Sequence, residues 1–266
     1  MDIDVLKRNN VKVFGEGQNA IIFAHGYGAD QNAWRYIYEA FAPDYKVVLF
    51  DFVGSGQSDQ SAYDKAKYHN LNGYASDVLD IAEALNLKDA IFVGHCVSSM
   101  VGMLASLEKP GLFKKLVFLG PSACYINDGD YAGGLNPAEL DSLFDVMDNN
   151  YQGWARAMAP AVIGNPDRPE LGEGYTADWI IYDPEVARNF ARATFLSDNR
   201  RFLPHVNVPS LSLICDEDIL ATPAAVKYIN ENTPENTVKE LDASGHCPHL
   251  SAPVEVIKAI REYIQN

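Results

Sequence analysis

The sequence predicts an α/β fold with a mainly parallel sheet. Short apolar segments with the character of buried strands alternate with longer segments whose apolar residues recur at helical spacing, as at 71–87. The 266 residues are 47% apolar and 21% charged, as expected of a globular chain with a large core. The predicted strands are 11–14, 20–24, 46–50, 90–93, 115–119, 208–215 and 237–241.

Composition excludes several classes of partner. The formal net charge of −15 argues against nucleic acid or an anionic membrane, because phosphates are bound by clustered Lys and Arg. The four cysteines form no C-x-x-C pair, so neither disulfides nor a metal site is expected. The glycine-rich turn at 51–58 has neither the Gly-Lys-Ser/Thr ending of a P-loop nor the G-x-G-x-x-G spacing of a dinucleotide-binding turn. No cofactor is therefore expected. Met1-Asp2-Ile3-Asp4 does not resemble a signal peptide, and no apolar run approaches the ~20 residues of a membrane span, so we expect a cytoplasmic protein.

The first two predicted strands are expected to be joined by a hairpin-type turn at 15–19. The second strand is apolar throughout, as in the centre of a sheet, and it runs into His25-Gly26-Tyr27-Gly28. The two glycines allow a sharp bend that exposes backbone N–H groups, which a developing oxyanion requires. An ordinary loop is the alternative for these residues taken alone.

The strand at 90–93 is followed closely by Cys96 and then by a predicted helix at 101–107. A strand, a tight turn and a helix are the arrangement in which α/β hydrolases present their nucleophile. Cys96 stands where most such motifs have serine, and Ser98 stands where G-x-S-x-G has its last glycine. A buried structural cysteine is the alternative for Cys96 considered alone. We expect the neighbouring His95 to point away from the pocket.

No central strand is predicted between residues 122 and 201. This stretch instead contains helical patterns separated by Gly, Asn and Pro turns, and it is rich in large aromatic residues. We therefore predict a core domain formed by residues 1–121 and 202–266, with a helical cap at 122–201 inserted over the active-site face. The predicted cap helices are 137–149, 151–162, 177–181 and 184–196.

Asp218 and His246 complete a predicted triad with Cys96. The three residues occur in the order nucleophile, acid, histidine, and each follows a predicted strand, as this fold requires. The imidazole would take the proton of the thiol, and the carboxylate would orient the imidazole and stabilise its charged form. From the residues alone, Asp216 is the alternative acid and His249 the alternative base.

Many stretches resemble the α/β hydrolases related to the bacterial stress regulator RsbQ and to the plant karrikin and strigolactone receptors. They cover nearly the whole chain, including the cap. They are His25-Gly26-Tyr27-Gly28, Asp30-Gln31-Asn32-Ala33-Trp34, Val48-Leu49-Phe50-Asp51-Phe52-Val53-Gly54-Ser55-Gly56, Gly73-Tyr74, Gly94-His95-Cys96-Val97-Ser98, Gly120-Pro121-Ser122, Asn149-Asn150-Tyr151-Gln152-Gly153-Trp154, Asn165-Pro166-Asp167-Arg168-Pro169 and Gly245-His246-Cys247-Pro248-His249.

The resemblance implies an α/β-hydrolase fold with about eight mostly parallel strands, a four-helix cap and an apolar pocket between cap and core. It also implies Asp218 as the acid, His246 as the histidine, and the backbone amides of Tyr27 and Val97 as the oxyanion hole. Ser98 at the last position of the motif is also found in the plant receptors. The pocket residues that the resemblance implies are Tyr27, Tyr125, Trp154 and Phe195.

We therefore expect a hydrolase of small apolar esters or lactones that acts through an acyl-cysteine intermediate. The family nucleophile is serine, so Cys96 is either a natural thiol nucleophile or a replacement of serine. A thioester forms readily, but the water that hydrolyses it still needs His246 as base. The sequence is therefore consistent both with complete turnover and with an acyl-enzyme that is not released. Two alternatives are hydrolytic C–C cleavage of ring-fission diketones and RsbQ-like signalling, in which the cap presents a surface to a regulatory protein.

Overall fold

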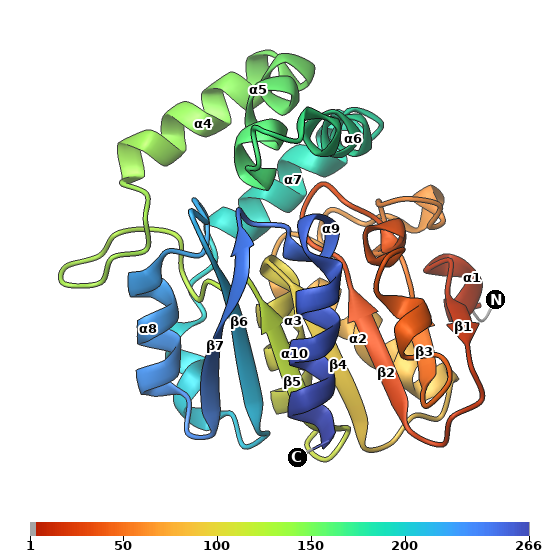
Figure 1. Cartoon of the computed structure of the whole chain (residues 1–266). Coiled ribbons are helices and arrows are strands. Elements are labelled where there is room, and N and C mark those ends of the chain that lie inside the picture. Colours follow the sequence, from red (N-terminus) through yellow and green to blue (C-terminus); the bar gives the residue numbers. More distant parts are fainter. Residues whose placement is uncertain (1–3, 266) are drawn as a thin grey trace.

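The computed structural model describes residues 4–265 and contains one seven-stranded sheet in the order β1-β3-β2-β4-β5-β6-β7 (Figure 1). Residues 1–3, on which the expectation about a signal peptide partly rests, lie outside the described residues. The α/β-hydrolase fold is confirmed, with seven strands in the described chain where the resemblance implied about eight. The strands are β1 (Lys12–Phe14), β2 (Ala20–Ala24), β3 (Lys46–Leu49), β4 (Ala90–His95), β5 (Phe113–Leu119), β6 (Ser210–Asp216) and β7 (Asn236–Ser244).

The expected hairpin between the first two strands is wrong. Strand β3 lies between them, antiparallel to β1 and parallel to β2. The fully buried strand β2 therefore gains a parallel neighbour on each side, because β4 pairs with its other edge. The remaining pairs from β4 to β7 are also parallel. All strands except β1 consequently end at the same edge of the sheet.

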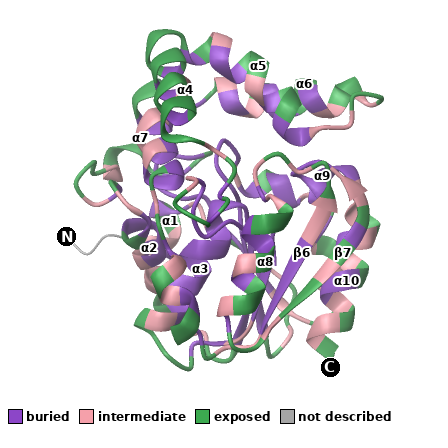
Figure 2. Cartoon of the chain, turned by 90° about the vertical axis from the view of Figure 1, so that its left-hand side faces the viewer, coloured by how far each residue is buried: buried purple, intermediate pink, exposed green. Residues whose placement is uncertain are grey.

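Helices cover both faces of the sheet. Alternate residues of a strand point to opposite faces, so Ile21 packs in the cluster that contains Ile260, whereas Ile22 packs in the cluster that contains Val78. Helix α3 is buried from Val97 to Ser106 (Figure 2). The helices of the core are α1 (Val5–Arg8), α2 (Leu71–Ala84), α3 (Val97–Glu108), α8 (Pro223–Asn232), α9 (Pro248–Ser251) and α10 (Pro253–Gln265).

Four further helices lie above the carboxyl edge of the sheet, between β5 and β6 in the chain (Figure 1). The third of them is longer than expected from the sequence, because it begins at a proline and continues through two glycines that interrupt the apolar pattern. Within residues 4–265, no helix has the length and apolar character needed to cross a membrane. The four helices are α4 (Pro137–Asn149), α5 (Tyr151–Ile163), α6 (Pro169–Ile180) and α7 (Pro184–Phe195).

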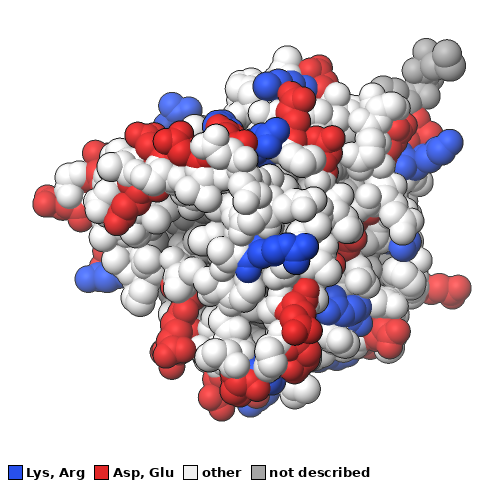
Figure 3. Space-filling view, turned by 90° about the horizontal axis from the view of Figure 1, so that it is seen from above, with Lys and Arg blue, Asp and Glu red and all other residues white. Residues whose placement is uncertain are grey.

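On the face that carries these four helices, acidic and basic side chains are interspersed around a large uncharged area (Figure 3). The excess of acidic residues in the chain, 36 Asp and Glu against 21 Lys and Arg, therefore does not form a single acidic surface on this side.

Candidate active site

Cys96 occupies the turn between the end of β4 and the start of α3. Its backbone has a φ of 57°, in the left-handed region that residues other than glycine rarely adopt. This conformation is typical of the sharp strand-to-helix turn that presents a nucleophile. The side chain lies at the helix N-terminus, where the helix dipole favours a negative charge. Only 4% of the residue is exposed.

His246 and Asp218 form a buried pair. The Nδ1 atom of His246 lies 2.8 Å from Oδ2 and 2.9 Å from Oδ1 of Asp218. The carboxylate also accepts hydrogen bonds of 2.9 Å from the backbone N–H groups of Leu220 and Ala221, which fix its orientation. The second ring nitrogen of His246, Nε2, has no hydrogen-bond partner of good geometry among the described residues. It is therefore the ring nitrogen that can exchange a proton with Cys96.

The thiol and the imidazole are close enough to change each other's pKa. Burial opposes ionisation of Cys96, but the charge and hydrogen bonding of His246 outweigh it and lower the pKa of the thiol. Burial likewise opposes a charged imidazole, yet Asp218 and Cys96 raise the pKa of His246 well above its ordinary value. Burial of Asp218 would raise the pKa of its carboxyl group. The charge and hydrogen bond of His246 outweigh this effect, and the pKa falls to about 2. The arrangement favours a thiolate–imidazolium pair.

The loop after β2 lies against the candidate nucleophile. A methyl group added to Gly26 would stand 2.6 Å from Nδ1 of the buried His95 and 3.1 Å from Cβ of Cys96, so glycine allows the loop to approach both residues this closely. The backbone N–H of Tyr27, one of the two expected oxyanion amides, donates no hydrogen bond within residues 4–265. The backbone of Val97, which carries the other, makes a hydrogen bond that helps to lower the pKa of the thiol. The Val97 amide and Gly26, the residue before Tyr27, therefore both lie against Cys96.

Two side chains fix the start of this loop. Ser98, fully buried in α3, donates a hydrogen bond from its hydroxyl to the carbonyl of His25. The His25 ring accepts at Nε2 from the N–H of Phe52, at 3.2 Å, so its proton is on Nδ1 and is donated to the carbonyl of Gly26, at 2.9 Å. Ser98 thus has a packing and hydrogen-bonding role that the glycine of the common motif could not fill.

Aromatic side chains fill the space above Cys96. Of the expected pocket residues, Tyr27 contacts Trp154 and Phe195, with ring centroids 6.2 and 6.4 Å apart, and Tyr125 packs on Phe195 at 5.0 Å. The Tyr125 hydroxyl lies 3.6 Å from the Cys96 sulfur. Sequence reasoning gave no site role to Trp179 and Phe190, which contact Tyr27 at 5.2 and 5.6 Å. The four-residue spacing of Tyr175 and Trp179 could have indicated that both lie on one face of a helix. The predicted helix began at residue 177, so this pattern was missed.

The alternative acid and base lie elsewhere. Asp216 is exposed, and it contributes only its backbone carbonyl, which accepts from the N–H of Gly245. His249 is buried against His95, with ring centroids 4.3 Å apart, and neither of its ring nitrogens has a partner in the described chain. His95 itself bonds through Nε2 to the backbone carbonyl of His246, at 2.9 Å. Within residues 4–265, no group of three or more His, Cys, Asp or Glu is placed to hold a metal ion.

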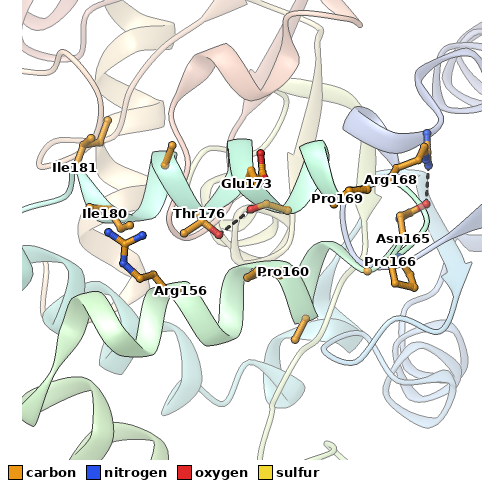
Figure 4. A pocket seen from close by; sticks show the side chains of 14 residues that line it. Arg156, Pro160, Asn165, Pro166, Arg168, Pro169, Glu173, Thr176, Ile180 and Ile181 are labelled. Atoms are coloured by element: carbon orange, nitrogen blue, oxygen red, sulfur yellow. Dashed lines mark hydrogen bonds between the residues drawn. The ribbon is translucent and has the colours of Figure 1, made fainter.

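A groove of about 1010 Å³ lies between α5 and α6 (Figure 4). Pro160 and Ile180 contribute to its apolar lining, Arg156 and Glu173 add charge, and at one end Arg168 donates to the side chain of Asn165. None of the expected site residues lines it. The groove is therefore separate from the chemistry at Cys96.

The chain belongs to the α/β hydrolase fold family, whose model matches residues 19–253. Within this family it is similar to plant receptors and esterases, which confirms the resemblance found in the sequence. It is 35% identical to "Karrikin insensitive 2 receptor CA" of Petunia hybrida over 98% of this chain and 97% of the relative. It is 36% identical to "Strigolactone esterase RMS3" of Pisum sativum over 95% of each chain. A solved hydrolase from Oleispira antarctica is 38% identical, with a TM-score of 0.96 over 99% of this chain and 97% of the other.

Proposed function

We propose that the protein hydrolyses small, apolar carboxylic esters or lactones through an acyl-cysteine intermediate on Cys96. The observation that carries this proposal is the buried chain of groups from Cys96 through His246 to Asp218. A thiol with a lowered pKa at a helix N-terminus is a reactive nucleophile, and the neighbouring imidazole of His246 can transfer protons to and from it.

The reaction has two steps. The Cys96 thiolate attacks the substrate carbonyl carbon, and the charge that develops on oxygen is stabilised by the backbone N–H groups of Tyr27 and Val97. The carbonyl re-forms as the C–O bond to the alcohol breaks, and His246 gives its proton to the departing oxygen, which in a lactone stays attached to the acyl group. Water then attacks the thioester, passes a proton to His246 and releases the carboxylic acid and the thiolate.

The substrate class follows from the surroundings of Cys96. In the proposal residues 122–201 act as a cap, and the aromatic side chains beneath α5 to α7 supply an apolar wall. The substrate contacts in this proposal are Tyr27, Tyr125, Trp154 and Phe195. These four residues are at most 6% exposed, which favours a small ligand that enters as the cap or its side chains move.

A second candidate function is ligand-dependent signalling. It is favoured by the relatives that are named receptors and by the nearly complete enclosure of Cys96. In that case the acyl or ligand-bound state persists, and a regulatory protein partner binds at the cap. Slow turnover together with a ligand-dependent rise in melting temperature would favour this function over rapid hydrolysis.

The test is turnover of p-nitrophenyl acetate and butyrate by the parent and by Cys96→Ala, with intact-mass spectrometry after incubation with a panel of esters and lactones. We expect an acyl adduct on the parent and neither adduct nor turnover in the variant. Equal hydrolysis by Cys96→Ala would show that Cys96 is not the nucleophile. An adduct that forms and is not released would support the signalling function.

A further inference from the structure

Helix α6 lies directly against the loop that carries the Tyr27 amide. The hydroxyl of Tyr175 donates to the carbonyl of Tyr27 at 3.4 Å, and the hydroxyl of Tyr182 donates to the carbonyl of Ala29. Between them, Trp179 packs on Gly28, where an added methyl group would stand 2.1 Å from the indole nitrogen. Gly28 has a φ of +72°, so both its conformation and this contact require glycine.

The contacts follow the geometry of a helix. Residues 175, 179 and 182 are spaced i, i+4 and i+7, which places them on one face of α6 and its C-terminal extension. That face meets the loop in order, with each of the three aromatic side chains contacting one of three consecutive loop residues, 27 to 29. Tyr175 and Tyr182 are only 3% and 6% exposed, so their hydroxyls have little access to water as an alternative partner.

These bonds complete the support of the Tyr27 backbone. The peptide bond is planar and trans, so the N–H of Tyr27 points opposite to the carbonyl of Gly26, which the His25 ring already holds from the core. The next peptide group presents the carbonyl of Tyr27, and its partner is Tyr175 on the other side of the loop. The two peptide groups that flank Tyr27 are thus held from opposite sides, one by the core and one by α6.

We propose that Tyr175 and Tyr182 are positioning residues that make the oxyanion-binding geometry of Tyr27 depend on the docking of α6 onto the loop at 27–29. The inference rests on the proposed function, because it assigns a role to the Tyr27 amide in that reaction. When α6 lifts from the core, the carbonyls of Tyr27 and Ala29 lose their hydroxyl donors. The amide then loses its fixed direction, and transition-state stabilisation falls while the thiol remains reactive.

The test uses Tyr175→Phe, Tyr182→Phe and the double variant, which remove the hydroxyl groups and keep the rings. The matched control is Thr176→Val on the same helix, which also removes a buried hydroxyl group; that hydroxyl donates to the carbonyl of Gly172 inside α6, at 2.7 Å. We expect the double variant to lower kcat for ester hydrolysis by roughly tenfold with KM nearly unchanged, less than the 10²–10³ typical when an oxyanion donor is deleted.

Three further measurements separate positioning from general disorder of the site. A trifluoromethyl ketone, which forms a tetrahedral thiohemiketal, should lose affinity by the same factor as kcat, whereas alkylation of Cys96 by iodoacetamide, which needs no oxyanion hole, should keep its rate. Amide hydrogen exchange in the peptide that contains residues 25–29 should accelerate in the double variant and not in Thr176→Val.

The inference is overturned if the double variant keeps the parental kcat, inhibitor affinity and loop exchange. It is also overturned if alkylation slows as much as hydrolysis, or if Thr176→Val has the same effect as the double variant. A parent that neither hydrolyses esters nor becomes acylated at Cys96 would instead refute the proposed function. Loop exchange would then still decide whether the two hydroxyls hold the loop.

Discussion

The Nδ1 atom of His246 lies 2.8 Å from the Oδ2 atom of Asp218, and both side chains are buried, at 1% and 3% exposure. The carboxylate keeps its charge in this setting because His246 and two backbone N–H groups stabilise it. The proton on Nδ1 is thereby fixed, and Nε2 is left as the atom that exchanges protons. The pKa of His246, and through it the pKa of Cys96, therefore depends on the charge of the Asp218 carboxylate.

Asp218→Asn should lower kcat/KM for ester hydrolysis by roughly 10²- to 10³-fold. The reason is that the amide carries no charge to stabilise the imidazolium, although the loss should be smaller than for a serine nucleophile because a thiolate needs less assistance. Asp216→Asn is the matched control, since this carboxylate is exposed and lies two residues before Asp218, and its rate should stay close to that of the parent. Comparable losses in the two variants would contradict the assignment of Asp218.

The two steps of the reaction should differ in their dependence on pH. The pKa of Cys96 is lowered, so the thiolate that acylates is present at a lower pH than for an ordinary thiol, near 8.5. Deacylation needs neutral His246, whose pKa is raised, and Asp218 keeps it raised in the acyl-enzyme. The burst of p-nitrophenol should therefore saturate at a lower pH than the steady-state rate in stopped-flow measurements. Coincident profiles would argue against this division of roles.

Ser98→Ala should destabilise the protein and slow hydrolysis together. The variant leaves the buried carbonyl of His25 without its donor, at a cost of about 1–3 kcal/mol in the free energy of unfolding. It also loosens the loop that carries the Tyr27 amide. Ser106→Ala is the control in the same helix, because its hydroxyl bonds only locally, to the carbonyl of Met103 at 2.6 Å. Chemical denaturation and kcat measure the two effects, and an unchanged kcat would exclude a role for Ser98 in holding the loop.

Phe195→Ala should widen the space above Cys96. We expect kcat/KM to rise for longer acyl chains relative to acetate, because the ring packs on both Tyr27 and Tyr125. The free energy of unfolding should fall by about 3–5 kcal/mol, as for other buried aromatic truncations. Phe144→Ala in α4 removes a comparable buried ring that lies beneath Arg192, and it should lose stability without changing chain-length preference. A series of p-nitrophenyl esters would show whether the preference shifts in Phe195→Ala alone.

Much of the fold and of the site was predictable because the relevant signals are local. Buried strands, helical periodicity and the strand-to-helix turn at Cys96 are written in short stretches of sequence, and parallel strands deliver their end loops to one edge of the sheet. Pairing between strands is not local, which is why the hairpin prediction failed when β3 took the place between β1 and β2. The early start of α6 was missed because glycines weakened its pattern.

The amino-acid sequence is enough to order Cys96, Asp218 and His246 along the chain and to predict that each follows a strand. Tertiary packing then brings Asp218, and not the exposed Asp216, to the imidazole, a choice that the residues alone left open and the family resemblance implied. It also decided that Tyr175 supports the backbone of Tyr27, 148 residues away along the chain. No sequence pattern records such a contact, because it arises only when α6 packs onto the end of the sheet.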